Sequence, residues 1–167
     1  MSNLITYSDF STYIDVSVNI TSAKRIDPYI KEAQEFDIRE LLGDLFYQRV
    51  TASPSTYATL LNGGTYTYEG ETYSFVGLKA AHVYFTYARF ILNDDLRSTP
   101  SGLKRKLTNE SEPISERSLS RYASQAREAA NSYWNQCHRF LCRQTDSIYD
   151  DFCGKDNTGK TVTITAI

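Results

Sequence analysis

The segment from Ser115 to Arg143, SERSLSRYASQAREAANSYWNQCHRFLCR, decides the fold class. Ser115 is a residue type that caps helix N-termini, and behind it apolar residues recur every three or four positions. The recurring residues are Leu119, Tyr122, Ala126, Ala129, Tyr133, Cys137, Phe140 and Leu141. This spacing predicts one long amphipathic helix, so we expect a mainly α protein.

A second long helix is predicted to begin directly after Gly77. Aromatic and aliphatic side chains widen its apolar stripe, so we expect the helix to be buried over much of its girth. The stripe and its flanks comprise Leu78, Ala81, Tyr84, Phe85, Tyr87, Ala88, Ile91 and Leu92.

Shorter helical segments are predicted upstream. Thr6 and Asp9 resemble a capping box that opens the first segment, and a break at Gly43 separates the next two. The middle segment begins either at Ser22 or at Pro28. Its apolar stripe shifts by one residue near the end and comprises Ile26, Ile30, Ala33, Phe36 and Leu41.

A period of two replaces the helical period over residues 65–76, on both sides of a glycine. This alternation predicts a β-hairpin with Glu69-Gly70 as its two-residue turn. Such a turn pairs Tyr66 with Tyr73 and places Tyr68 on the same face. Because an isolated hairpin is only marginally stable in water, we expect this one to lie on a helix or on another subunit.

Two segments lie outside these patterns. Residues 97–115 contain prolines, a glycine and the basic run Lys104-Arg105-Lys106, which together predict a long loop. After residue 145 the helical pattern ends, and the last seven residues alternate like a strand. We therefore expect a helical bundle with an inserted β-hairpin, residues 1–145, followed by an extended C-terminal tail, residues 146–167.

Composition places the chain among ordinary globular proteins. It has 167 residues, of which 41% are hydrophobic and 23% charged, and that balance excludes disordered and collagenous classes. No apolar run approaches the roughly 20 residues that span a bilayer, and no secretory signal is recognised at the start. We therefore expect a soluble chain of intracellular origin. Its 13 tyrosines indicate a large amphipathic contact surface.

Charge is unevenly distributed along the chain. Residues 97–143 contain nine Lys or Arg against four Glu, a net charge of +5, which leaves −7 for the rest. Such a subunit can attract a copy of itself head to tail, or can simply have two differently solvated faces.

The segment Gly154–Thr161 matches the phosphate-binding pattern G-x-x-x-x-G-K-[ST]. A working phosphate loop needs a buried strand before it and a helix after it. Here the preceding residues are acidic and the following ones alternate like a strand. We therefore interpret the match as a turn in the tail and expect no nucleotide cofactor.

Cys137, His138, Cys142 and Cys153 have the composition of a zinc site. Cys137 and Cys142, however, point about 140° apart on a helix, and no CxxC pair is present. We interpret the cysteines as small buried hydrophobes and expect no metal.

His82 is interpreted as a core or interface histidine. Adjacent acidic pairs do not converge on one point, so no catalytic residue is predicted.

Motifs spread over most of residues 4–143 resemble small connector proteins of tailed bacteriophages. They are IKEA at 30–33 leading to LLG at 41–43, YEGETY at 68–73, GLK at 77–79, YFTYARF at 84–90, TPSG at 99–102, EPIS at 112–115, and Ala129, Asn131, Tyr133 and Trp134 in the long helix. The resemblance implies an all-helical adaptor without catalytic residues. It also implies a ring of twelve subunits between the portal and the tail, through which DNA passes.

We therefore expect a structural virion protein, made in the cytoplasm of a bacterial host and located at the head–tail junction. Expected partners are copies of itself, the portal, tail or other connector proteins, and packaged DNA by non-specific contact, with no membrane. The alternatives are another capsid or tail accessory (head-completion) protein, and a nucleotide- or metal-dependent enzyme. The expected contact residues are Tyr66, Tyr68, Tyr73, Phe75, Lys104, Arg105, Lys106, Val162 and Ile164.

Overall fold

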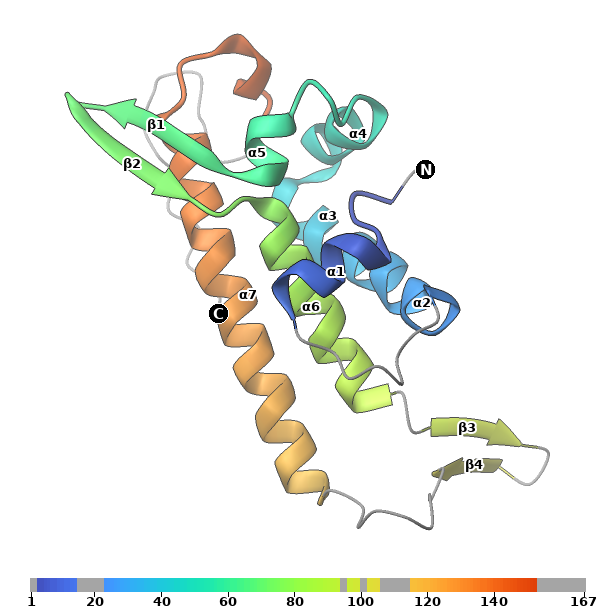
Figure 1. The fold of residues 1–167 in the computed structure, drawn as a ribbon. Helices are drawn as coiled ribbons and strands as arrows, with labels where there is room; N and C mark the ends of the chain where they lie inside the picture. Colours follow the sequence, from blue (N-terminus) through green and yellow to red (C-terminus); the bar gives the residue numbers. More distant parts are fainter. Residues whose placement is uncertain (1–2, 15–22, 94–95, 100–101, 106–114, 153–167) are drawn as a thin grey trace.

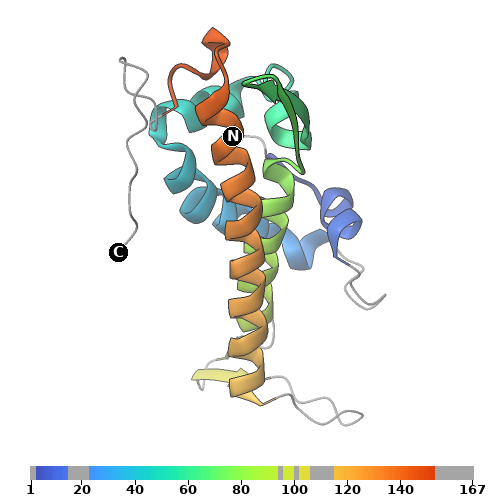
Figure 2. The same ribbon diagram turned by 90° about the vertical axis from the view of Figure 1, so that its left-hand side faces the viewer.

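A computed structural model describes residues 3–14, 23–93, 96–99, 102–105 and 115–152. An antiparallel pair of long helices, α6 (Leu78–Asn93) and α7 (Glu116–Arg143), forms its centre and is visible in Figures 1 and 2. The expected class, mainly helical with an inserted hairpin, is confirmed. Within the described ranges, no helix is long and apolar enough to cross a membrane.

Helix α7 begins where its sequence predicts. Ser115 is the N-cap residue, and its Oγ accepts a hydrogen bond from the Ser118 backbone N–H at 3.2 Å. Tyr122 is 47% exposed, although its spacing suggested burial. The buried side of α7 is instead formed there by Ala123 and Ala126. The buried residues of α7 are Ala123, Ala126, Ala130, Trp134, Cys137, Phe140 and Leu141.

Helix α2 (Ala23–Ala33), the π-helical turn η2 (Gln34–Ile38) and α3 (Arg39–Leu42) follow one another without a break. A step of four residues overshoots a full α-helical turn by about 40°, and the wider π turn absorbs the excess. The predicted shift of the stripe therefore has a structural cause, although Phe36 is exposed rather than buried. Of the two predicted starts, the earlier one is confirmed, with Pro28 inside the helix. The buried residues are Ile26, Ile30, Ala33, Gln34, Ile38 and Leu42.

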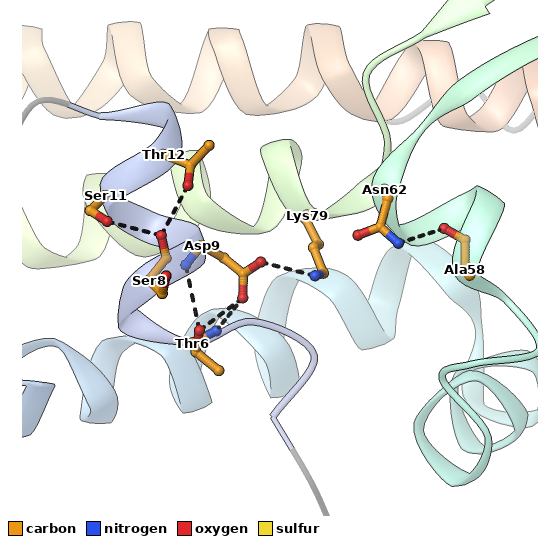
Figure 3. Close-up of polar contacts among 8 residues, drawn as sticks. All are labelled: Thr6, Ser8, Asp9, Ser11, Thr12, Ala58, Asn62 and Lys79. Atoms are coloured by element: carbon orange, nitrogen blue, oxygen red, sulfur yellow. Dashed lines mark hydrogen bonds and ion pairs between the residues drawn. The ribbon is translucent and has the colours of Figure 1, made fainter.

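Helix α1 (Tyr7–Tyr13) opens with the predicted capping box, shown in Figure 3. The Asp9 backbone N–H donates to Thr6 Oγ1 at 3.4 Å, and Asp9 Oδ2 accepts from the Thr6 backbone N–H at 2.9 Å. Lys79 of α6 binds the same carboxylate at 2.9 Å. Burial alone would raise the pKa of Asp9, but the hydrogen bonds from Lys79 and Thr6 outweigh it, so this pKa is lowered. The ion pair holds α1 against α6.

Two apolar clusters form the core. The larger cluster lies among α3, α4 (Asp44–Ala52), α5 (Ala58–Asn62) and the C-terminal half of α7. It also includes the first hairpin, which is formed by β1 (Gly64–Tyr68) and β2 (Glu71–Phe75). The smaller cluster lies among α1, α2 and α6. Helix α6 contributes to both clusters, which explains why it is buried over so much of its surface.

The first hairpin leaves and rejoins the helical body through two glycines with positive φ, Gly63 at 82° and Gly77 at 100°. A Cβ atom on Gly77 would overlap the backbone of Asn62 and Gly63, and one on Gly63 would overlap the backbone of Phe75 and Val76. The two backbone segments are therefore in direct contact, and only glycine fits at this crossing.

A second hairpin replaces part of the loop expected over residues 97–115. Strand β3 (Leu96–Thr99) pairs antiparallel with β4 (Gly102–Arg105). Figure 1 shows this hairpin beside the N-terminal end of α7, away from the first hairpin. The predicted loop is therefore wrong for residues 97–99 and 102–105, which are strands.

Residues 146–152 fold back onto the helical domain. The 3₁₀ turn η3 (Ser147–Tyr149) places Tyr149 and then Phe152 in the larger core cluster, where their side chains are 4% and 3% exposed. Asp151 forms an ion pair with Arg49 of α4. These contacts correct the predicted boundary between domain and tail at residue 146.

Candidate functional site

The first hairpin consists of β1 (Gly64–Tyr68) and β2 (Glu71–Phe75). Its register pairs Tyr66 with Tyr73, as predicted, and their rings stack with centroids 5.5 Å apart. Tyr68 lies on the same face, two residues along β1. The expectation that this hairpin lies on a helix is also met, because β2 contacts α7.

An arginine from α7 covers the tyrosine face. The Arg143 guanidinium carbon lies 4.4 Å from the ring centroid of Tyr73 and 4.8 Å from that of Tyr68. Its Nη1 donates a hydrogen bond to the Tyr66 hydroxyl at 3.1 Å. Three of the predicted contact residues are thus brought together around a cation of the same chain. Helical periodicity did not single out Arg143, because the apolar pattern of α7 carries no information about which residues of another element lie beside it.

Phe75 is not a surface contact residue. Its side chain is only 5% exposed, and its ring stacks on that of Phe140 with centroids 4.3 Å apart. Tyr66 also packs edge-on against both rings, at 6.0 Å from Phe75 and 5.4 Å from Phe140. The base of the hairpin therefore belongs to the core of this chain, which corrects the assignment of Phe75 to an interface.

The remaining predicted contact residues lie apart from this hairpin. Lys104 and Arg105 are in β4, where Lys104 pairs with Arg97 and Arg105 with Leu96. The other three predicted contact residues and the phosphate-loop match lie outside the described residues. They are Lys106, Val162, Ile164 and Gly154–Thr161.

His82 is a core histidine, one of its two predicted roles. Its side chain is 1% exposed, and its Nε2 lies 3.0 Å from the Ile30 carbonyl oxygen, which assigns the ring proton to Nε2. Within the described part of the chain, Nδ1 has no hydrogen-bond partner. Burial lowers the pKa of His82 to about 4, so the imidazole is neutral at pH 7 and serves as a structural donor.

The cysteine-rich end of α7 is also mostly structural. Cys137 is fully buried, and burial raises the pKa of its thiol to about 12, which makes the thiolate inaccessible. Cys142 Sγ lies 3.6 Å from His138 Nδ1, a weak contact within one helix. No group of three metal-ligating side chains occurs among the residues that the structure describes, and Cys153 lies outside them.

An ionic cluster joins η2 to the central helix pair. Arg89 of α6 donates two hydrogen bonds to the Asp37 carboxylate, at 2.8 and 3.0 Å, and their side chains are only 19% and 11% exposed. Arg127 of α7 lies 4.0 Å from the same carboxylate. The Arg89 guanidinium also lies 5.4 Å from the centroid of the Phe36 ring. This cluster was missed because its partners are far apart in sequence.

A second polar network starts from the π turn. The Tyr47 hydroxyl donates to Glu35 at 2.7 Å and accepts from the Gln34 amide at 3.1 Å. Gln34 in turn accepts from the Leu4 backbone N–H at 2.7 Å. Burial and the bond to Glu35 raise the pKa of Tyr47 to about 12, so its hydroxyl remains a donor. The network fixes the N-terminal segment and α4 on η2.

A shallow hollow opens beside this network. Its volume is about 390 Å³, and it is lined by Glu35, Phe36, Arg39, Glu40, Gly43 and Asp44. The arrangement offers carboxylates, an aromatic ring and one guanidinium, which are groups that recognise another surface by contact.

Residues 38–162 match a sequence family described as "Family of unknown function (DUF6712)". The matched range includes both long helices and both hairpins. No curated protein and no solved structure is significantly similar to the chain.

Proposed function

The chain belongs to the DUF6712 family of unknown function, and we propose that it is a structural virion protein of a tailed bacteriophage. In this proposal it is a head–tail connector subunit that assembles into a ring between the portal and the tail. The ring forms part of the DNA channel and contacts portal and tail proteins on its two sides.

The observation that carries this proposal is the second hairpin. Strands β3 and β4 stand at the end of the central helix pair, outside the main body, as Figure 1 shows. A two-stranded hairpin is marginally stable by itself, and in this proposal a neighbouring molecule of the assembly supports it. Lys104 and Arg105 lie in its second strand, and cations at such a place suit the phosphates of a passing DNA duplex.

Two further features support an assembling subunit. The motifs that resemble phage connector proteins lie mainly on α6, α7 and the first hairpin, which form most of the framework of this fold. In addition, large apolar side chains are exposed on several elements, and an assembling subunit would cover some of them at its contacts with neighbouring subunits. These side chains are Phe36, Leu45, Val76, Leu92 and Tyr122.

The experiment is size-exclusion chromatography with light scattering of the purified chain, followed by negative-stain imaging. We expect closed rings with a central opening. A chain that stays monomeric and decorates the outside of capsids would instead support the accessory-protein alternative. Labelling of virions with an antibody against the chain should place it at the head–tail junction.

The channel role has its own test. Lys104→Glu combined with Arg105→Glu should leave ring assembly intact but reduce non-specific binding of the ring to duplex DNA. The binding of the unchanged ring should weaken steeply as salt rises. Equal DNA binding by the two rings would remove β4 from the channel wall.

A further inference from the structure

One flank of the molecule carries two exposed apolar side chains set among carboxylates. Phe36 of η2 is 62% exposed and Leu45 of α4 is 55% exposed. Phe36 lines the shallow hollow together with Glu35, Glu40 and Asp44, and Leu45 directly follows Asp44 in α4. We call these five residues the acidic face.

The acidic face keeps a negative charge after its internal ion pairs are counted. Arg39 binds Asp44 at 2.6 Å and Glu35 at 3.3 Å, so one guanidinium is shared by two carboxylates. Glu40 adds a third carboxylate at the rim of the hollow and is exposed. The face therefore attracts a cation from outside the subunit.

Phe36 is held in its exposed position. The Arg89 guanidinium lies 5.4 Å from its ring centroid, and the same guanidinium is fixed by two hydrogen bonds to Asp37. An exposed ring that is already ordered loses little conformational entropy when a partner covers it. Phe36 is thus prepared for docking.

A second face lies on α7. Tyr122 is 47% exposed, and the Arg121 guanidinium carbon lies 5.4 Å from its ring centroid. Tyr133 is eleven residues further along, which is about 20° from Tyr122 around the helix axis, and it packs against Tyr84 of α6 at 5.3 Å. We call the exposed pair Arg121 and Tyr122 the Arg–Tyr face.

The two faces lie on different flanks of the central helix pair. Arg127, which approaches Asp37 of η2 at 4.0 Å, is about 140° from Tyr122 around α7. The faces of one subunit therefore cannot meet each other, but those of two copies can. Contacts between two different faces are head to tail, and they close into a ring when the rotation permits.

We propose that the acidic face of one copy receives Arg121 and Tyr122 of a second copy. This inference rests on the proposed ring function and names the surfaces that build the ring. Tyrosine and arginine are the residue types that most often dominate interface energies. The Arg121 guanidinium meets Glu40 at the rim, and the Tyr122 ring packs against Phe36 and Leu45.

The test uses two variants that each block one face, Phe36→Asp and Tyr122→Asp. Each alone should lose ring assembly, with association weakened about 30-fold or more, as for other interface hot spots. Mixed in equal amounts, they should form a dimer and nothing larger, because one intact acidic face remains to meet one intact Arg–Tyr face. The measurement is light scattering or analytical ultracentrifugation, with helical circular dichroism to show that both variants are folded.

The matched control is Ala58→Asp, which places the same new carboxylate at an exposed residue of α5 outside both faces. It should assemble like the unchanged chain. If the unchanged chain forms rings and the face variants do so equally well, this pairing is overturned and the ring function stands. Loss of assembly without a dimer in the mixture would also overturn the pairing. An unchanged chain that stays monomeric up to about 1 mM would overturn the ring function as well.

Discussion

The ring of Phe75 lies nearly parallel to that of Phe140, with centroids 4.3 Å apart and an angle of 18° between the planes. One ring comes from the end of β2 and the other from the C-terminal half of α7, so this stack fastens the first hairpin to the long helix. The hairpin is consequently both a surface, through its tyrosines, and part of the core, through its base.

Phe75→Ala should therefore destabilise the monomer. Removing a buried phenylalanine leaves a cavity and typically costs about 3–5 kcal/mol. The control Val76→Ala changes the neighbouring side chain, which is 40% exposed, and should change stability by less than about 0.5 kcal/mol. Urea unfolding followed by circular dichroism measures both. Similar midpoints for the two variants would show that the hairpin base is not core.

Gly77→Ala should be far more destabilising than Gly70→Ala. Both glycines have positive φ, 100° and 83°, so alanine pays a similar backbone cost of about 1–2 kcal/mol at either. Only at Gly77 would the new Cβ also overlap backbone, that of Asn62 and Gly63, whereas Gly70 faces open space. Thermal melting of the two variants separates steric overlap from backbone strain. Equal losses would mean that the crossing of the two segments is not tight.

Short-range sequence patterns were sufficient to predict the first hairpin and the starts of the helices. The alternation around Gly70 was sufficient to predict the pairing of Tyr66 with Tyr73, because turn length alone fixes the register of a hairpin. Likewise, Ser115 marked the start of α7 through its capping chemistry. In both cases the deciding interactions are between residues close in sequence.

Contacts between distant segments could not be predicted in this way. Asp37 and Arg89 are 52 residues apart, and nothing in either helical pattern marks the other as its partner. Tyr149 and Phe152 lie in a segment without a helical or strand period, so periodicity could not predict that they are buried. The exposure of Phe36 could not be predicted either. A π turn has more residues per turn than an α-helix, so the α-helical period gives the wrong direction for side chains in and after it.

Acidification should destabilise the chain through His82. Burial lowers its pKa to about 4 in the folded chain, against 6.5 for the ordinary imidazole. As pH falls below about 6.5 the unfolded chain binds the proton first, so the free energy of unfolding decreases until about pH 4. The full loss is about 3 kcal/mol, since each pKa unit corresponds to about 1.4 kcal/mol.

His82→Gln provides the control, because an amide can still donate to the Ile30 carbonyl but does not titrate in this range. Its urea midpoint should therefore depend much less on pH over the same interval, and the remaining dependence should come from His138, whose pKa is also lowered by burial. Asp9, whose pKa lies below the ordinary 3.8, loses its contribution only at lower pH. If the unchanged chain and His82→Gln lose stability in parallel, His82 is not the titrating group.

Arg89→Leu should be strongly destabilising, whereas Arg127→Leu should not. Both arginines approach the Asp37 carboxylate, but Arg89 makes two hydrogen bonds to it in a partly buried site, and Arg127 is 46% exposed at 4.0 Å. Losing Arg89 removes both hydrogen bonds from a carboxylate that is only 11% exposed and leaves it with the distant Arg127 alone, which costs up to about 3–5 kcal/mol. Losing Arg127 removes an exposed pair worth less than about 1 kcal/mol.

The double variant Asp37→Leu with Arg89→Leu should recover most of the loss, because neither charge then remains unpaired. Urea unfolding of the four proteins decides the matter. A double variant as unstable as Arg89→Leu alone would show that the arginine acts through packing on Phe36 rather than through its ion pair.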